Sequence, residues 1–578
     1  MKKIDSITLE IIGNQLLSVA EEMGVTLIKT SYSTNIKERK DCSTAIFDSK
    51  GNIIAQAEHI PMHLGSMLGV VTEILKKYPR EHIYPGDMFI TNDPYSGGGT
   101  HLPDITVVAP VFTNGELAAF VANLAHHADV GGKVPGSTSG DATSVFQEGI
   151  RIPLIKICSK GNILNDVLEF IQLNSRTPYD RLGDLRAQIA SNSVGVKRLA
   201  NLIRSHGIEK FKSCSESLLD YAESMIKSGI KRIPDGEYSF IDYLDDDGIN
   251  LDNPIPIQVK IKINDDHAYL DFTGSSPQVK GPVNVTLNGL LTTVFYCFKA
   301  LIGPKIFSNQ GIFRALTVHA PEKSIVNCLA PAAIGERIDT CQRVVDVIFG
   351  AMAKAIPDKV IAACNSAVTT ATFSGINPKS NDFYVYLETI AGGSGASQNS
   401  DGLSGVQVHM TNTSNLSVEA LEQEFPLLIE KYQLCKDSGG AGLYRGGLGI
   451  EREIMVLHDN VTFSGLADRH KHAPWGLNGG MPGSTGTFWV KRNEEEPEKL
   501  ISKVSDVHLN TGDKISVCTP GAGGYGNPLL RDPLKVLQDV HEGKVSIEAA
   551  KNLYKVILSE DGQSINEEET FKARNTPI

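Results

Sequence analysis

The chain has 578 residues, which is too long for one compact core and indicates roughly two to four domains. Its formal charge of −12 argues against nucleic acid binding, which needs a clustered excess of basic residues, and 41% hydrophobic with 21% charged residues is typical of a globular protein. No apolar run reaches the roughly 18 residues of a membrane-spanning helix, so we expect a cytoplasmic protein that binds neither nucleic acid nor membranes.

The first predicted element is an amphipathic helix that begins near Asp5 or Ser6. Its apolar stripe repeats at steps of three and four residues and consists of Leu9, Ile12, Leu16, Ala20 and Met23. After this helix the pattern changes to strands. Residues 42–56 predict a hairpin that turns at residues 49–52, with Asp41 at its entrance.

A second hairpin is predicted from two apolar runs, ITVVAPVF and LAAFVANLA, that flank Asn114-Gly115. Asn-Gly between apolar runs is the strongest short hairpin signal. In a regular ladder from this turn, Asp104 faces Ala125, so residues some 25 apart in sequence come within about 5 to 8 Å of each other. The hairpin therefore gathers the histidines and aspartates at its open end.

The same ladder does not choose between two neighbouring histidines. Side chains alternate along a strand, so a regular ladder places His127 on the face of Asp104 and His126 on the face of His101. Pro103 opposes a regular ladder at that end. The sequence pattern therefore leaves undecided whether His126 or His127 lies beside Asp104.

Metal-liking side chains are concentrated between Thr91 and Asp129, and they comprise Asp93, His101, Asp104, His126, His127 and Asp129. A single histidine at a strand end most often has only a structural role. However, strand packing alone does not explain why His-x-x-Asp and His-His-x-Asp occur at the same end of one hairpin. A set of nitrogen and oxygen ligands suits zinc, manganese or iron(II), so the sequence predicts a site for a divalent transition metal.

Three other motifs carry weaker signals. His59 and His63 have the spacing of a zinc-binding helix, but Pro61 opposes that helix, so they orient ligands, contact substrate or have structural roles. Residues 521–526 satisfy G-x-G-x-x-G, but Asn-Pro follows where a helix should begin, which argues against a dinucleotide site. The basic loop 469–472 either meets an anionic group or forms a solvated turn.

The remaining pattern indicates the domain organisation. Residues 161–230 are predicted to be mostly helical, alternating strands follow residue 235, glycine clusters dominate from about residue 430, and helical patterns with a tail expected to fray end the chain. We expect an α+β, multi-domain fold with β-rich mixed sheets and a helical N-terminal portion. The predicted domains are a metal-binding N-terminal domain (1–235), a central α/β domain (236–430) and a Gly-rich β domain with a C-terminal helical tail (431–578).

Five motifs resemble the hydantoinase B/oxoprolinase (HyuB) family: NDPYSGGGTHLPD, HHADVGGKVPGS, DFTGSSPQ, DRHKHAPWGLNGG and TPGAGGYGNPLLRDP. They occur in order along nearly the whole chain. This family includes the B subunit of N-methylhydantoinase, part of 5-oxoprolinase, a caprolactamase subunit, and subunits of acetone and acetophenone carboxylases.

The resemblance implies a set of site residues. Metal ligands of relatives correspond here to His101, Asp104 and His126, with an additional carboxylate at Asp41, which resolves the histidine choice by analogy. His127, Asp129 and Asp93 are then candidates for orienting ligands or moving protons. One zinc or manganese ion is expected.

The resemblance also implies function and partners. The leading hypothesis is a metal-dependent subunit of an ATP-dependent cyclic amidohydrolase that opens a hydantoin, lactam or 5-oxoproline ring. An A-type ATPase subunit would use the ATP, since this sequence has no P-loop motif, and the two would form a hetero-oligomer. The alternatives are a subunit of an acetone- or acetophenone-type carboxylase, and a scaffold for the ATPase without chemistry of its own.

Overall fold

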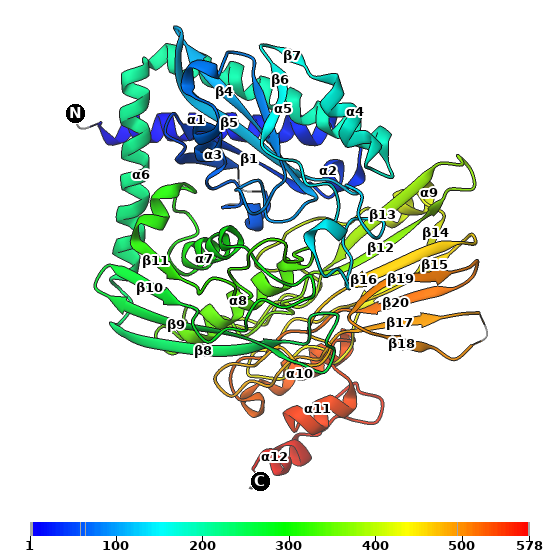
Figure 1. The fold of residues 1–578 in the computed structure, drawn as a ribbon. Coiled ribbons are helices and arrows are strands. Elements are labelled where there is room, and N and C mark those ends of the chain that lie inside the picture. The colour runs from blue at the N-terminus through cyan, green and yellow to red at the C-terminus, as the bar shows by residue number, and fades with distance from the viewer. Residues whose placement is uncertain (1–3, 58, 64, 494, 576–578) are drawn as a thin grey trace.

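The structure, a computed structural model, describes residues 4–57, 59–63, 65–493 and 495–575. Helices are combined with several separate sheets, which confirms the predicted α+β, multi-domain class. Figure 1 shows the N-terminal part above, a second sheet with its helices below it, and the later strands to the right. The predicted first helix is present, with Asp5 accepting a hydrogen bond from the Thr8 N–H at 2.9 Å as its N-cap.

The first sheet has the strand order β2-β1-β5-β4-β3-β6-β7 and is antiparallel. Its strands are β1 (Cys42–Asp48), β2 (Ile53–Ala57), β3 (Met88–Thr91), β4 (Asp104–Thr113), β5 (Glu116–His126), β6 (Ile155–Ser159) and β7 (Asn162–Ile163). The associated helices are α1 (Ser6–Thr30), α2 (Thr34–Lys37), α3 (Val70–Lys77), α4 (Asn165–Leu173), α5 (Pro178–His206) and α6 (Ile208–Ile230). Both predicted hairpins, β1–β2 and β4–β5, are confirmed.

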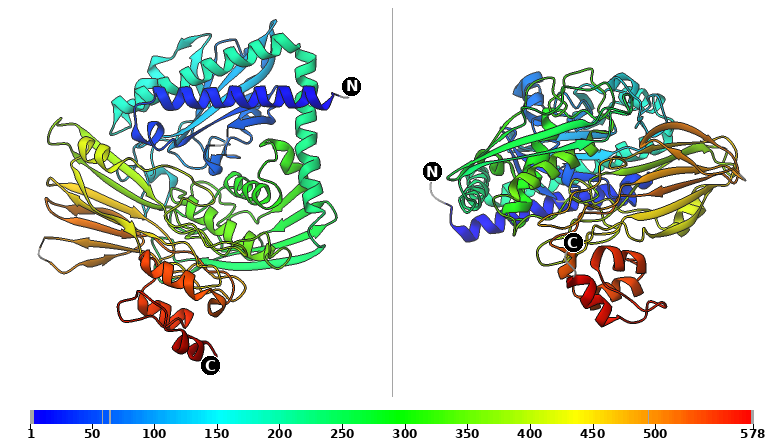
Figure 2. Two further views of the ribbon diagram at one scale, coloured as in Figure 1. Left: turned by 180° about the vertical axis from the view of Figure 1, so that it is seen from behind. Right: turned by 90° about the horizontal axis from the view of Figure 1, so that it is seen from below.

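Helices cover both faces of the first sheet. On one face, Ile105 and Val107 of β4 belong to the same apolar cluster as residues of α1 and α5. In the left view of Figure 2, which is seen from behind, these two helices lie in front of the sheet. On the other face, Val108 and Phe120 pack with Val70 of α3. A strand buried on both faces needs apolar residues at every position, which explains the unbroken runs in β4 and β5.

The second sheet has the order β11-β10-β9-β8 and leaves one face open to solvent. Its strands are β8 (Gly236–Leu244), β9 (Ile255–Asn264), β10 (His267–Asp271) and β11 (Leu316–His319). The helices α7 (Leu287–Ile302) and α8 (Arg337–Met352) cover the inner face. Burial alternates along β9, as the alternating sequence predicted.

Two further sheets pack face to face around a shared apolar cluster. Their orders are β13-β12-β16-β19 and β14-β15-β20-β17-β18. The strands are β12 (Thr369–Ile376), β13 (Phe383–Ile390), β14 (Leu427–Leu434), β15 (Ile450–Val456), β16 (Val461–Leu466), β17 (Thr487–Lys491), β18 (Glu498–Leu500), β19 (Lys503–Leu509) and β20 (Lys514–Cys518), and α9 is Val418–Glu424. One sheet joins strands from both sides of residue 430, and the division into domains stays a prediction.

The glycine clusters allow chain segments to pack backbone against backbone. A Cβ on Gly523 would lie 2.0 Å from the carbonyl oxygen of Trp475, and one on Gly446 would lie 1.9 Å from that of Ala522. Side chains would force these segments apart. Residues 521–526 therefore have a packing role, and a short 3-10 turn over Pro528–Leu530 follows them instead of the helix of a dinucleotide site.

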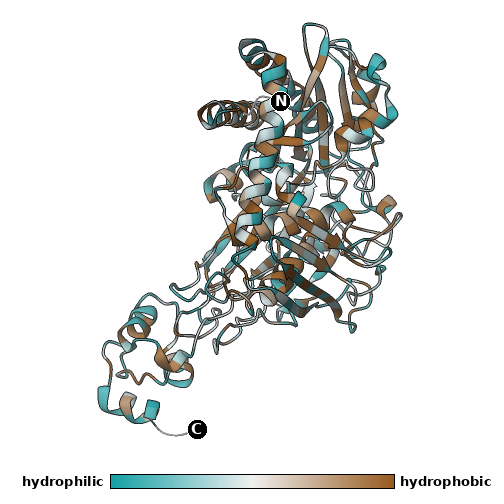
Figure 3. Cartoon of the chain, turned by 90° about the vertical axis from the view of Figure 1, so that its left-hand side faces the viewer, coloured by the Kyte–Doolittle hydropathy of each residue, from teal (hydrophilic) through white to brown (hydrophobic). Residues whose placement is uncertain are grey.

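The last helices, α10 (Pro533–His541), α11 (Ile547–Tyr554) and α12 (Glu567–Asn575), project from the body together with the C-terminus, as Figure 3 shows. Val536 and Tyr554 form a small apolar cluster there. The segment that was expected to fray is helical through Asn575. Among the described residues, no helix is both long and apolar enough to cross a membrane.

Candidate metal centre

A β-bulge decides which histidine faces Asp104. β5 contains one residue more than β4 between the turn and the open end, and Ala118 is the position that the pairing skips. Asp104 therefore pairs with His126 and not with Ala125, so the predicted regular ladder is wrong at this end. A shift of one residue exchanges the two faces of a strand, which moves His126 onto the face of Asp104.

Three ligand atoms from this hairpin end lie close together. His101 Nε2 is 3.1 Å from Asp104 Oδ1 and 3.2 Å from His126 Nδ1, and His126 Nδ1 is 3.4 Å from Asp104 Oδ1. Tetrahedral zinc with bonds of about 2.0 to 2.1 Å separates its ligand atoms by about 3.3 to 3.4 Å. The spacing of the triad therefore fits a single transition metal ion.

The chemistry of these atoms also fits a cation. A metal ion binds through lone pairs, which an ionised carboxylate and two neutral imidazoles supply together. Burial, followed by the nearby Arg337, lowers the pKa of His101 to about 4, so its ring is neutral at pH 7. Burial alone would raise the pKa of Asp104, but His101 and Arg337 outweigh it and hold that pKa well below its usual range.

The side chains of Asp41 and His63 also lie close to the triad. Asp41 Oδ2 lies 4.0 Å from His126 Nδ1, and Asp41 Oδ1 lies 3.8 Å from His63 Nε2. His63 Nε2 is also 4.0 Å from Asp104 Oδ1, while its Nδ1 contacts the Ser43 hydroxyl at 3.2 Å. The structure thus brings the predicted ligand Asp41 to the cluster and adds His63.

His59, which pairs with His63 in sequence, lies outside this group. Residues 61–63 form a 3-10 turn and not the zinc helix that their spacing suggested, in agreement with the argument from Pro61. His59 instead borders a different cavity beside Lys299 and Pro304. The two histidines therefore have different surroundings despite their regular spacing.

A cavity adjoins the donors, and residues from distant parts of the chain close it. Its lining includes Arg39, Thr138, Glu336, Arg337, Thr370, Thr389, Thr411 and Thr413 in addition to the donors. Arg337, at the start of α8, contacts Asp104 Oδ2 at 3.1 Å and the Thr100 hydroxyl at 2.8 Å through Nη2. No local sequence motif marks Arg39, Glu336 or Arg337, so these three residues were not predicted.

His127 points away from the cavity. Its Nε2 lies 3.0 Å from Gln188 Oε1, and its Nδ1 contacts Arg181 Nη1 inside the protein. Both ring nitrogens are therefore engaged by α5. This placement does not support the predicted role of His127 in moving protons at the metal.

Asp129 and Asp93 also have structural partners outside the cavity. Asp129 accepts hydrogen bonds from the N–H groups of Gly131 and Gly136, and Arg176 Nη1 lies 3.0 Å from its Oδ2. Asp93 is held by Arg151, with a contact of 2.9 Å. Both carboxylates fix loops near the site, and the structure does not bring them to the triad of His101, Asp104 and His126.

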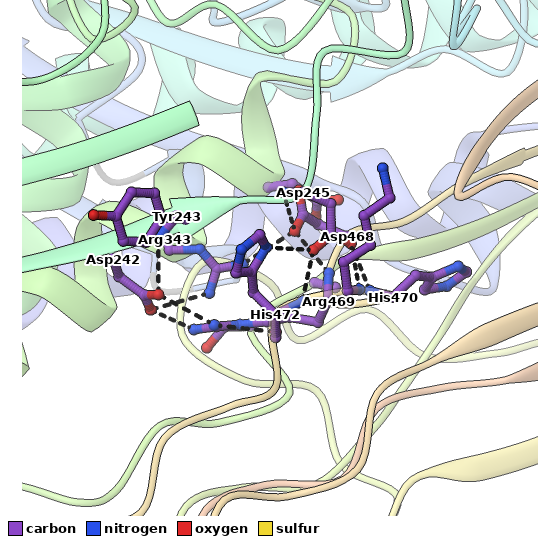
Figure 4. A network of polar contacts seen from close by, with 12 residues as sticks. Asp242, Tyr243, Asp245, Arg343, Asp468, Arg469, His470 and His472 are labelled. Carbon is purple, nitrogen blue, oxygen red and sulfur yellow. Dashed lines mark hydrogen bonds and ion pairs between the residues drawn. The ribbon is translucent and has the colours of Figure 1, made fainter. Parts of the chain in front are cut away.

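The basic loop 469–472 meets carboxylates of the protein itself. Figure 4 shows Arg469 and Asp245 within this network. Arg469 Nη2 lies 2.7 Å from Asp242 Oδ2 and 2.6 Å from Asp346 Oδ2, and Asp245 accepts backbone N–H groups of residues 470–472. The loop therefore joins the end of β8 to the end of β16, and its charges already have partners.

The family model for hydantoinase B/oxoprolinase matches residues 5–528. An uncharacterized protein from Methanocaldococcus jannaschii is 42% identical over 99% of this chain and 100% of its own length. The B subunit of a putative D-/L-hydantoinase from Pseudomonas sp. strain NS671 is 34% identical over 99% of this chain and 98% of its own. The 5-oxoprolinase 1 of Arabidopsis thaliana is 35% identical over 90% of this chain, which spans 42% of that longer protein.

Solved structures agree with these relatives. The ATP-dependent caprolactamase from Pseudomonas jessenii superposes with a TM-score of 0.91 at 28% identity, and all of both chains is covered. An acetone carboxylase structure gives a TM-score of 0.92 at 21% identity over 99% of this chain and 82% of its own, a likeness that concerns the fold alone. The resemblance recognised in the sequence motifs is confirmed, and the chain belongs to the hydantoinase B/oxoprolinase family.

Proposed function

We propose that this chain is the metal-dependent subunit of an ATP-dependent enzyme that opens a cyclic amide, such as a hydantoin, lactam or 5-oxoproline ring. The observation that carries the proposal is the buried triad of His101, Asp104 and His126, whose ligand atoms lie 3.1 to 3.4 Å apart. Relatives named as a hydantoinase B subunit and as 5-oxoprolinases, and a solved ATP-dependent caprolactamase, support the same reaction class.

The triad, with Asp41 and His63 beside it, would hold one zinc or manganese ion. When bound, the ion lowers the pKa of a water molecule and polarises a carbonyl oxygen. Arg337 holds Asp104 through Oδ2, which leaves Oδ1 directed at the two histidines. This fixed carboxylate keeps the ligand set preorganised.

Part of the cavity lining suits an anionic group. Arg39 Nε and the Thr138 hydroxyl are buried, and neither has a hydrogen-bond partner in the described part of the chain. Both residues line the cavity. Buried donors without acceptors are costly unless a ligand satisfies them, and guanidinium groups bind phosphate and carboxylate oxygens well.

These two donors support a reaction that is shared with a partner subunit. An amide carbonyl is a poor electrophile, and phosphorylation of its oxygen by an A-type ATPase subunit would create a good leaving group. The phosphorylated ring would then place its anionic oxygens against Arg39 and Thr138 and its carbon near the triad. The functional unit in this proposal is a hetero-oligomer of the two subunits.

The first test is elemental analysis of the purified wild-type chain beside His101→Ala, with His59→Ala as the control histidine outside the cavity. We expect about one transition metal per wild-type and His59→Ala chain and little in His101→Ala. With the ATPase partner added, only the metal-loaded proteins should open the ring. Equal metal content in all three proteins would refute the assignment of the site.

A second assay separates the hydrolase from a carboxylase subunit. Ring opening by the hydrolase requires ATP and water, whereas a carboxylase consumes a ketone only when bicarbonate is present. Bicarbonate-dependent loss of acetone or acetophenone would replace the proposed reaction with the carboxylase alternative. Full activity of the ATPase partner alone would instead indicate a scaffold.

A further inference from the structure

Two carboxyl groups meet at the start of α8, where Glu336 is the N-cap and Asp339 lies in the first turn. Glu336 is 2% exposed and lines the same cavity as the metal donors, and Asp339 is fully buried. The side chains of these two residues contact each other. Neither residue has a role in the ligand set described above.

Hydrogen-bond accounting indicates that this pair holds a proton. Asp339 Oδ1 accepts the N–H of Val368 at 2.6 Å. Asp339 Oδ2 and Glu336 Oε1 are buried and receive no donor from the residues that the structure describes. Two ionised carboxylates in contact would repel each other strongly without water, whereas one shared proton supplies the missing donor.

The surrounding charges do not remove the need for that proton. Arg337 is directed at Asp104 and Thr100, and Lys503 Nζ lies 3.3 Å from Asp468 Oδ2 and 3.9 Å from Asp246 Oδ1. Burial, and after it the Asp339 carboxyl, raises the pKa of Glu336 well above its usual range. Burial, and after it Asp468, raises the pKa of Asp339 to about 6.

The loop before α8 holds Glu336 firmly at the cavity wall. Glu148 Oε1 accepts the N–H groups of Ile334 at 2.8 Å and Gly335 at 2.7 Å, and the Glu336 N–H donates to the carbonyl of Pro282 at 2.9 Å. A proton donor works best when its position is fixed before the reaction. Glu336 has this fixed position beside the metal donors.

We propose that Glu336, sharing a proton with Asp339, is the general acid that protonates the ring nitrogen as the amide opens. This inference rests on the proposed function. The water oxygen bonds to the ring carbon that carries the phosphorylated oxygen, the carbon–nitrogen bond breaks, and its bonding electrons go to nitrogen. Glu336 passes protons to the nitrogen, and the two protons lost by water return to the carboxyl pair, so this step yields an amine and an acyl phosphate. A second water then displaces the phosphate, and the final products are one carboxylic acid, one amine and inorganic phosphate.

The test compares wild type, Glu336→Gln and the control Glu451→Gln in the complex reconstituted with the ATPase partner. Glu451 lies on β15 outside the cavity. We expect Glu336→Gln to reduce turnover by about 100-fold or more with unchanged metal content, and Glu451→Gln to keep wild-type turnover. The loss should be smaller for rings whose nitrogen leaves as a weakly basic amine. Turnover of Glu336→Gln within about threefold of wild type, or a loss that is equal for all rings, would overturn the acid role.

A measurement without turnover tests the shared proton directly. At pH 7 the infrared spectrum of the wild-type chain should contain a C=O stretch of a protonated carboxylic acid that both Glu336→Gln and Asp339→Asn lack. Absence of this difference band would overturn the proposal whatever the turnover. If wild type opens no cyclic amide but the band is present, the proposed function fails and the acid role falls with it, while the proton-sharing pair stands.

Discussion

The two adjacent histidines at the end of β5 give a sharp test of the bulge. In the structure His126 Nδ1 lies 3.2 Å from His101 Nε2 and 3.4 Å from Asp104 Oδ1, whereas His127 is turned to Gln188. The matched substitutions His126→Gln and His127→Gln remove the same ring from opposite faces. Only the first should remove a metal ligand.

The expected size follows from the geometry. Loss of a group that merely orients a ligand costs roughly 10- to 100-fold in metal affinity, so loss of the ligand itself in His126→Gln should cost about 100-fold or more, or about 3 kcal/mol. His127→Gln should change affinity by less than about tenfold, although it leaves Arg181 without its imidazole contact and should lower stability.

Competition against a chromophoric zinc chelator, with apoprotein made by dialysis, measures both affinities on one scale. Circular dichroism of each variant confirms that it is folded before titration. If His127→Gln loses zinc and His126→Gln keeps it, the register with Asp104 opposite His126 is refuted. The regular ladder would then describe the hairpin in solution.

Three further predictions concern the surroundings of the site. His63→Ala should weaken zinc binding by about 10- to 100-fold in the same titration while His59→Ala leaves it unchanged, and equal effects would contradict the placement of His63 beside the triad. Burial raises the pKa of Glu148 to about 8 from its usual 4.5, so the stability that its protonated form provides is complete below pH 4.5 and is lost as the pH rises through 8. Glu148→Gln stays neutral, so its free energy of unfolding, measured with urea, should rise relative to that of wild type between pH 5 and 8, by a few kcal/mol at most; a constant difference would contradict the raised pKa. Gly523→Ala, whose Cβ would lie 2.0 Å from the Trp475 carbonyl oxygen, should lower the free energy of unfolding by about 3 kcal/mol or more in urea, and a wild-type midpoint would show that the glycine layers can separate.

Local patterns in the sequence predicted much of the fold. The stripe of α1, the Asn-Gly turn of the β4–β5 hairpin and the alternation in β9 each reflect contacts between residues near in sequence, so a short window contains the information. The α+β class follows from the same patterns. The long-range pairing that places β12 and β13 beside β16 and β19 has no such local signal.

The candidate metal ligands show the same limit within one hairpin. His-x-x-Asp and His-His at the two strand ends indicated a site, and the family resemblance selected His126. The physical basis of that choice is the extra residue at Ala118, which exchanges the faces of β5. A bulge within a buried apolar strand leaves no mark in the pattern of hydrophobic residues.

The sequence by itself determined the first helix, the β1–β2 and β4–β5 hairpins, the family, and the candidate ligands His101 and Asp104, because motifs and periodic patterns consist of residues close together in sequence. The family resemblance added Asp41 as a candidate ligand. Only the tertiary structure decided what surrounds them. It brought Glu336 and Arg337 from α8, more than 200 residues further along the chain, to the cavity, and it turned His127 into the interior. Burial and contacts between distant elements set these positions and charges, and both exist only once the chain has folded.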